Sequence, residues 1–122
     1  TERNTVVLDA YNANPTSMGL ALESFKKTNY KNKMIIVGDM FELGEDSNQY
    51  HQEITNSLEK INDSIIYLVG EYFCKTKHSD RIKSFSSTKE LINNLSKTNV
   101  SNYSILIKGS RGMQLEKIIE FI

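Results

Sequence analysis

The feature that most constrains this chain is an alternation of two hydrophobic patterns. Continuous apolar runs rich in Val, Ile and Leu occur at residues 5–11, 33–40, 64–70 and 103–110, with a shorter candidate at 82–85. Between them, apolar residues recur every three or four positions, at 15–28, 48–61, 86–98 and 111–122. The first pattern is typical of strands buried on both faces of a sheet, and the second of amphipathic helices.

Strands that alternate with helices pair in parallel, because each helix returns the chain to the edge where the next strand begins. We therefore predict an α/β fold: a three-layer, Rossmann-like, open and mostly parallel sheet with helices on both faces. The 122 residues suit one domain, residues 1–122, with a core of its own.

Composition argues against several classes of function. Fifteen Lys and Arg balance fifteen Asp and Glu, so no basic surface indicates a nucleic-acid partner.

We expect no membrane span and no signal peptide, because no apolar run is long enough and residues 1–9 lack the charged and apolar leader pattern. The single cysteine, Cys74, favours a reducing compartment. The chain begins without Met, almost directly on a strand, so we expect it to be part of a longer protein.

Polar residues gather where three of the predicted strands end. In open α/β sheets, ligands bind beyond the carboxyl ends of the strands, so these residues mark the expected binding edge. They are Asp9, Tyr11, Asn12, Asn14 and Pro15 after the first strand, Asp39 and Glu42 after the second, and Lys108, Ser110 and Arg111 after the last. His51, on the second predicted helix, is a further candidate.

Each candidate also has a purely structural interpretation. Asn12 and Asn14 belong to a residue type that satisfies turn backbone, and Asn14 before Pro15 is typical of a helix N-cap. Lys108 and Arg111 can hold an anion together with the N–H groups that open the last predicted helix, yet such residues are common on solvated rims. A lone helical histidine more often packs or caps than binds.

Several familiar sites are missing from the sequence. There is no G-x-x-x-x-G-K-[ST] phosphate loop, no G-x-G-x-x-G after the first strand, and no set of residues at metal-binding spacing. A phosphoreceiver domain is disfavoured, because the third predicted strand ends in LVGEY, with no Asp to accept a phosphoryl group.

Three blocks, DAYNANPTSM, VGDMFELGEDSNQYH and LIKGSRGMQLEKI, resemble the C-terminal domain of the Mur ligases. They occur in the family's order and span essentially the whole chain. Within the family, the Tyr-Asn-Ala-Asn turn and the GDMFELG block are most similar to the members that add D-alanyl-D-alanine to UDP-N-acetylmuramoyl-tripeptide.

The resemblance implies part of a cytoplasmic, bacterial, monomeric ligase of peptidoglycan synthesis. Such a ligase uses ATP and Mg²⁺ to convert the tripeptide carboxylate to an acyl phosphate, which the dipeptide amine then attacks. The domains that hold the phosphate loop, the magnesium and the UDP-sugar lie outside this sequence. We therefore expect the isolated chain to be inactive, to contribute no catalytic or metal-binding residue and to bind no cofactor tightly.

The family pattern implies that Asp9, Tyr11, Asn12, Asn14 and Pro15 face the nucleotide. From charge, we expect Asp39 and Glu42 to receive the ammonium group of the dipeptide, and Lys108, Ser110 and Arg111 to hold its carboxylate or a phosphate oxygen. His51 is assigned to substrate binding as well. Two alternatives stay open: a free-standing, flavodoxin-like binding or signalling module without catalysis, and a purely structural interaction domain.

Overall fold

The computed structural model describes all 122 residues and contains one five-stranded sheet in the order β1-β5-β2-β3-β4. Every pairing in it is parallel. The predicted α/β fold is confirmed, and the short strand predicted near residue 82 pairs in parallel with β3. The strands are β1 (Thr5–Asp9), β2 (Lys33–Gly38), β3 (Ser64–Val69), β4 (Lys83–Phe85) and β5 (Ser104–Lys108).

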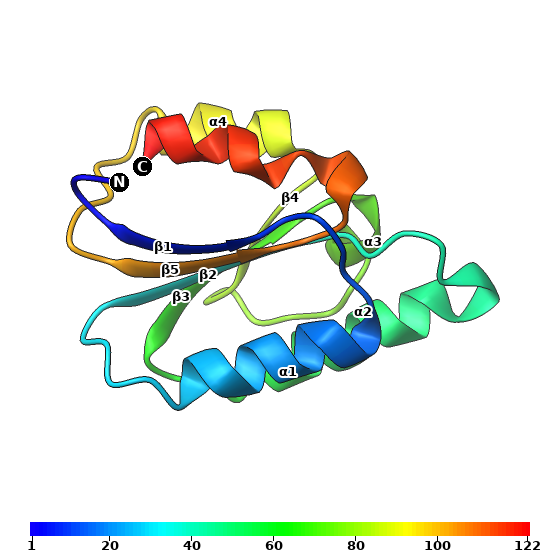
Figure 1. The fold of residues 1–122 in the computed structure, drawn as a ribbon. Coiled ribbons are helices and arrows are strands. Elements are labelled where there is room, and N and C mark those ends of the chain that lie inside the picture. Colours follow the sequence, from blue (N-terminus) through cyan, green and yellow to red (C-terminus); the bar gives the residue numbers. More distant parts are fainter.

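Helices cover both faces of the sheet (Figure 1). One face carries α1 (Pro15–Lys26), α2 (Ser47–Glu59) and the short α3 (Glu71–Cys74); the other carries α4 (Thr88–Leu95) and the 3₁₀ segment η3 (Leu115–Phe121). Two further 3₁₀ turns, η1 (Gly44–Asp46) and η2 (Arg111–Met113), lie in the loops after β2 and β5. No helix is both long enough and apolar enough to cross a membrane.

The sheet divides the core into two hydrophobic clusters. Met18, Leu22 and Phe25 of α1 belong to the cluster on one face, and Leu91 of α4 and Ile118 of η3 to the cluster on the other. All six residues of β2 are buried, because the strand has neighbours on both sides and helices above and below.

Two sequence expectations were wrong in detail. The first strand, predicted to be buried, is an edge strand that pairs with β5 alone, so Val7 and Leu8 are 42% and 43% exposed. The last predicted helix consists of the 3₁₀ segments η2 and η3, separated by Gln114 in the left-handed region (φ 54°). The α-helical N-terminus that was expected to hold an anion after β5 is therefore absent from this structure.

Strand order and connections single out the carboxyl end of β5. The chain leaves β1 and β2 toward the face of α1 and α2, whereas it leaves β5 toward the face of η3 (Figure 1). Adjacent chains therefore diverge on both sides of β5, which is the kind of position where open α/β sheets bind ligands.

Candidate functional site

A buried lysine joins the ends of β1 and β5. Lys108 is 2% exposed, and its Nζ lies 2.6 Å from Asp9 Oδ2 and 3.1 Å from the carbonyl oxygen of Asn12. Because the ammonium group donates to both the strand end and the following turn, it fixes the β1–α1 turn against β5. The Asp9 side chain remains 50% exposed at the surface.

The same turn combines a helix cap with exposed side chains. Asn14 accepts a hydrogen bond from the Ser17 N–H (2.8 Å), and the Ser17 hydroxyl receives the Asn14 N–H, so the predicted N-cap is confirmed. Tyr11 is 72% exposed, and the Arg111 guanidinium lies 5.2 Å from the centre of its ring, in cation–π range. A hollow of about 360 Å³ adjoins this pair and is lined by Leu8, Asp9, Ala10, Tyr11, Arg111 and Glu116.

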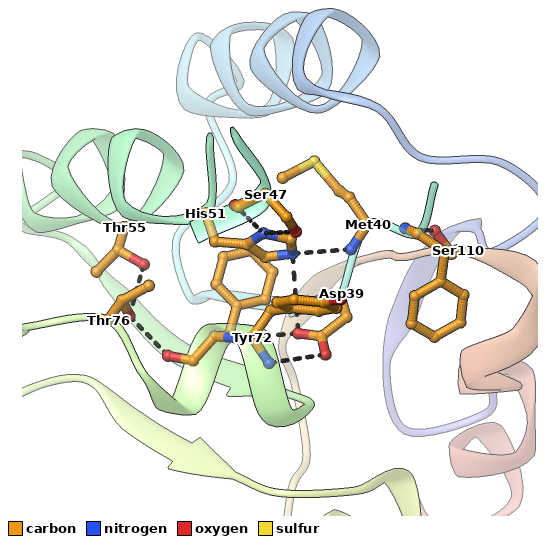
Figure 2. Close-up of polar contacts among 10 residues, drawn as sticks. Asp39, Met40, Ser47, His51, Thr55, Tyr72, Thr76 and Ser110 are labelled. Carbon is orange, nitrogen blue, oxygen red and sulfur yellow. Dashed lines mark hydrogen bonds and ion pairs between the residues drawn. The ribbon is translucent and has the colours of Figure 1, made fainter. Parts of the chain in front are cut away.

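Asp39, directly after β2, serves as a cap for α3. It is 3% exposed, and its carboxylate accepts the N–H groups of Tyr72 and Phe73, each at 3.0 Å (Figure 2). Burial raises the pKa of Asp39, and the two N–H bonds oppose the rise. Gly70 makes this approach possible, because a Cβ atom there would overlap the Asp39 carboxyl group.

Ser110 connects the loop after β5 to the loop after β2. Its N–H donates to the Asp39 carbonyl (3.0 Å), and its hydroxyl oxygen accepts the Phe41 N–H at 2.8 Å. Both loops are consequently held as one unit at the sheet edge. Phe41 in turn lies against Gly112, where a Cβ atom would be 2.8 Å from the ring.

His51 lies beneath this unit and does not reach the surface. It is 0% exposed; its Nε2 is 3.0 Å from the Met40 amide nitrogen, and its Nδ1 is 2.7 Å from the Ser47 carbonyl oxygen. Burial lowers the pKa of His51, with the Ser47 carbonyl and Asp39 opposing the change. Because Nε2 accepts the Met40 N–H, the ring is neutral in this arrangement, and its 3.9 Å separation from Asp39 Oδ1 is not an ion pair.

Two further hollows lie along the edge. One, of about 400 Å³, lies beyond β2, β3 and β4; its lining includes Asp39, Phe41, Glu71, Tyr72, Ser86, Ser87, Thr88, Lys89 and Gly112. The other, of about 710 Å³, lies between Asn14 and the exposed Glu42, with Tyr50 at its side. Glu42 has a left-handed backbone (φ 63°), which is uncommon for glutamate.

The structure thus divides the predicted site residues into two groups. Asp9, Tyr11, Asn12, Asn14, Glu42 and Arg111 are exposed at the rim and Pro15 is half-buried, whereas Asp39, His51, Lys108 and Ser110 are buried and bonded within the fold. In this conformation the four buried residues do not face solvent, and they influence the rim only by positioning the residues to which they are hydrogen-bonded.

Sequence reasoning missed the contribution of the third and fourth strands. Glu71 and Tyr72 follow β3, and Thr88 and Lys89 follow β4, at the edge already identified. The signal was available, since every parallel strand ends at that edge. The structure contains no group of three or more His, Cys, Asp or Glu side chains arranged to hold a metal ion.

Comparison with known proteins shows that the chain matches a protein family over most of its length. The family described as "Mur ligase, glutamate ligase domain" matches residues 1–111. The chain is 39% identical, over 98% of its length, to the UDP-N-acetylmuramoyl-tripeptide–D-alanyl-D-alanine ligase of Rickettsia prowazekii, and 33% identical, over 95%, to that of Bacillus subtilis. It spans 28% and 27% of the length of these curated relatives.

Solved structures agree with the fold. The crystal structure of MurF ligase from Thermotoga maritima in complex with ADP matches 99% of this chain, and the chain covers 28% of it, with a TM-score of 0.79 and 24% identity. A crystal structure of MurF from Acinetobacter baumannii matches 96% of the chain, which covers 27% of it, with a TM-score of 0.77 and 31% identity. Because the family match covers residues 1–111, this chain belongs to the Mur ligase family and corresponds to its C-terminal domain.

Proposed function

We propose that this chain is the domain of a monomeric, ATP-dependent ligase that closes over ATP and the incoming dipeptide, D-alanyl-D-alanine. The ligase joins that dipeptide to UDP-N-acetylmuramoyl-tripeptide in the bacterial cytoplasm, through an acyl phosphate. The names of the relatives at 39% and 33% identity support the substrates, and the family membership disfavours a free-standing binding or signalling module. The rest of the ligase lies outside the 28% of the relative's length that the chain spans.

The observation that carries the proposal is the exposed pair of Tyr11 and Arg111 beside Asp9. An aromatic ring stacks on a base, a carboxylate accepts from ribose hydroxyls, and a guanidinium binds phosphate oxygens. All three groups border one hollow at the end of β5. They therefore offer one face of a nucleotide site, with Asn12 exposed on the same turn.

The dipeptide fits the hollow beyond β2, β3 and β4. Its volume of about 400 Å³ is in the range of small-molecule sites. Glu71 supplies a negative charge for the ammonium group, Lys89 a positive charge for the carboxylate, and Phe41 an apolar surface for the methyl groups. The acid Glu42, on the same loop as Phe41, remains a second candidate for the ammonium group.

Positioning is the contribution that such a domain makes to the chemistry. Phosphoryl transfer depends on alignment and charge neutralisation, and closure keeps water from the acyl phosphate. The family resemblance implies that Mg²⁺ is held by the remainder of the ligase. With half of the nucleotide site elsewhere, the isolated chain binds ATP at a Kd of about 1 mM or weaker.

The test is phosphate release from ATP by the full-length ligase. We expect release to require both UDP-N-acetylmuramoyl-tripeptide and D-alanyl-D-alanine. Arg111→Ala should raise the KM for ATP by about 10-fold to 100-fold, the range for losing a hydrogen bond to a charged group. Release that needs no dipeptide would contradict the proposed function.

Arg3→Ala is the matched control. Arg3 is also exposed but precedes β1, at the opposite end of the sheet from the rim. It should leave KM unchanged for both substrates. Equal effects of the two substitutions would exclude a specific role for Arg111 and point to a general effect of surface charge.

A further inference from the structure

We propose that His51 is a positioning residue: as a neutral imidazole with one fixed tautomer, it holds the loop after β2 through the Met40 amide and thereby shapes the hollow for the amine substrate. The assignment of that hollow to an amine rests on the proposed function. The geometry of the histidine itself does not depend on it.

The two hydrogen bonds of His51 allow one tautomer. A backbone carbonyl only accepts, so Nδ1 must carry the proton that is donated to Ser47 (2.7 Å). A backbone amide only donates, so Nε2 must be unprotonated to accept from Met40 (3.0 Å). Figure 2 shows the ring between these two partners, bridging the start of α2 and the end of β2.

Three consecutive residues, Asp39, Met40 and Phe41, each anchor the loop after β2 by hydrogen bonds, and we call these anchors the three ties. The Asp39 carboxylate bonds the start of α3, the Met40 N–H bonds His51, and the Phe41 N–H bonds Ser110. Each tie reaches a different element: α3, α2 and the loop after β5. Losing the middle one frees the loop between two residues, Asp39 and Phe41, that line the hollow.

His51 also supports the opposite wall of the hollow from behind. Its ring stacks on Tyr72, with centroids 5.0 Å apart and planes at 20°. It packs nearly perpendicular to Phe73, with centroids 4.7 Å apart and planes at 77°. Tyr72 lines the hollow, whereas His51 is 0% exposed. The histidine therefore acts through its neighbours and touches no ligand.

Protonation would undo this arrangement. An imidazolium has no acceptor for the Met40 N–H, and its new Nε2–H would face that N–H group, with Asp39 Oδ1 3.9 Å from Nε2. Asp39 is the charged group that faces the ring; its other neighbours, Ser47 on α2 and Tyr72 and Phe73 on α3, are uncharged. Burial keeps the pKa of His51 low and so favours the neutral, loop-holding form.

Two neutral substitutions separate the two hydrogen bonds. In His51→Gln, the amide oxygen can occupy the place of Nε2 and accept from Met40. In His51→Asn, the amide nitrogen can occupy the place of Nδ1 and donate to Ser47, but the Met40 N–H loses its partner. Ile54→Val is the stability control, because Ile54 is a buried core residue of the same helix and takes no part in either hydrogen bond of His51.

In the full-length ligase, His51→Asn should raise the KM for D-alanyl-D-alanine by about tenfold, as expected for one unpaired buried donor, with the KM for ATP unchanged. His51→Gln should restore most of the loss, and Ile54→Val should change melting temperature without changing KM. An equal rise in KM for Gln and Asn, or an equal rise for both substrates, would overturn the proposal.

A measurement on the 122-residue chain decides the geometry independently of the ligase assay. Nitrogen-15 shifts should show the Nδ1–H tautomer of His51, and amide exchange at Met40 and Phe41 should speed up in His51→Asn but not in His51→Gln. An Nε2–H tautomer, or unchanged exchange in His51→Asn, would overturn the proposal. If these results hold while the wild-type ligase shows no dipeptide dependence, the proposed function fails and the loop-holding role stands.

Discussion

At Lys108, a charged side chain at the binding edge has its ammonium group engaged inside the fold. Two of its three protons are donated to Asp9 and to the Asn12 carbonyl. The sequence predicted that Lys108 binds an anion. In the structure its side chain is 2% exposed and is not free to do so. Lys108 therefore serves mainly to position the turn that carries Tyr11 and Asn12.

We predict that Lys108→Met lowers the free energy of unfolding by about 1.5–3 kcal/mol, the range for hydrogen bonds to a charged group. The lower end is expected, because the Asp9 side chain is 50% exposed and water can replace the lysine. Amide exchange at residues 11–14 should accelerate, since the anchor of the turn is lost. Urea denaturation and exchange measured by NMR check both effects.

Lys33→Met provides the matched control at the other end of the sheet. Lys33 is 3% exposed, donates to the Lys26 carbonyl at 3.1 Å and lies 3.8 Å from Asp63. Its removal should also cost stability, but exchange at residues 11–14 should not change. The same acceleration in both variants would show that the turn responds to global stability and not to Lys108.

Among the elements, α3 depends most on its surroundings. With four residues it is too short to be stable alone. Asp39 bonds its first N–H groups, and at its other end the Thr76 hydroxyl donates to the Phe73 carbonyl (2.6 Å) while Thr55 donates to Thr76 (Figure 2). The wall of the hollow that α3 forms is thus set by contacts from the loop after β2 and from α2.

Two glycine substitutions should have opposite effects on stability. Gly70→Ala should lower the free energy of unfolding by at least about 2 kcal/mol, because φ is +121° and the new Cβ would overlap Asp39. Gly19→Ala, within α1 and with nothing within 4 Å of the new Cβ, should raise it by about 0.5–1 kcal/mol. Urea titrations measure both, and a neutral Gly70→Ala would contradict the Asp39–α3 contact.

The sequence predicted those elements whose signal is local. β2, β3 and β5 were identifiable as apolar runs, and the Asn14 cap depends on a residue three positions away. Burial of β1 was mispredicted, because a strand's pattern does not reveal whether it has a second neighbour. The 3₁₀ form of η3 was missed, since recurrence every three or four residues fits both kinds of helix.

The edge of the site was predictable for the same reason, but the roles of its residues were not. Parallel strands place their ends together, so the cluster followed from the fold class. Whether a member faces solvent or the interior depends on partners distant in sequence: Asp39 bonds a residue 33 positions away, and Lys108 one 99 positions away. Such long-range pairings cannot be predicted from a local sequence pattern.

Considered as a whole, the molecule encloses a single imidazole next to its binding edge, and this links global stability to pH. Burial lowers the pKa of His51 from its ordinary value of 6.5. As pH falls through about 6.5, the unfolded chain takes up a proton at this histidine before the folded chain does, so unfolding is favoured. The contribution of His51 to stability is complete above that pH and declines below it.

We predict that stability falls between pH 7 and 5.5 with a contribution from His51 of at most about 1.4 kcal/mol per pH unit, the limit for one proton. Asp39 acts in the opposite sense: its raised pKa means that stability declines as pH rises above 3.8 toward the folded-state value. The informative quantity is therefore the difference between wild type and His51→Gln in urea titrations across this range. A slope that persists unchanged in His51→Gln would show that the buried imidazole is not the titrating group.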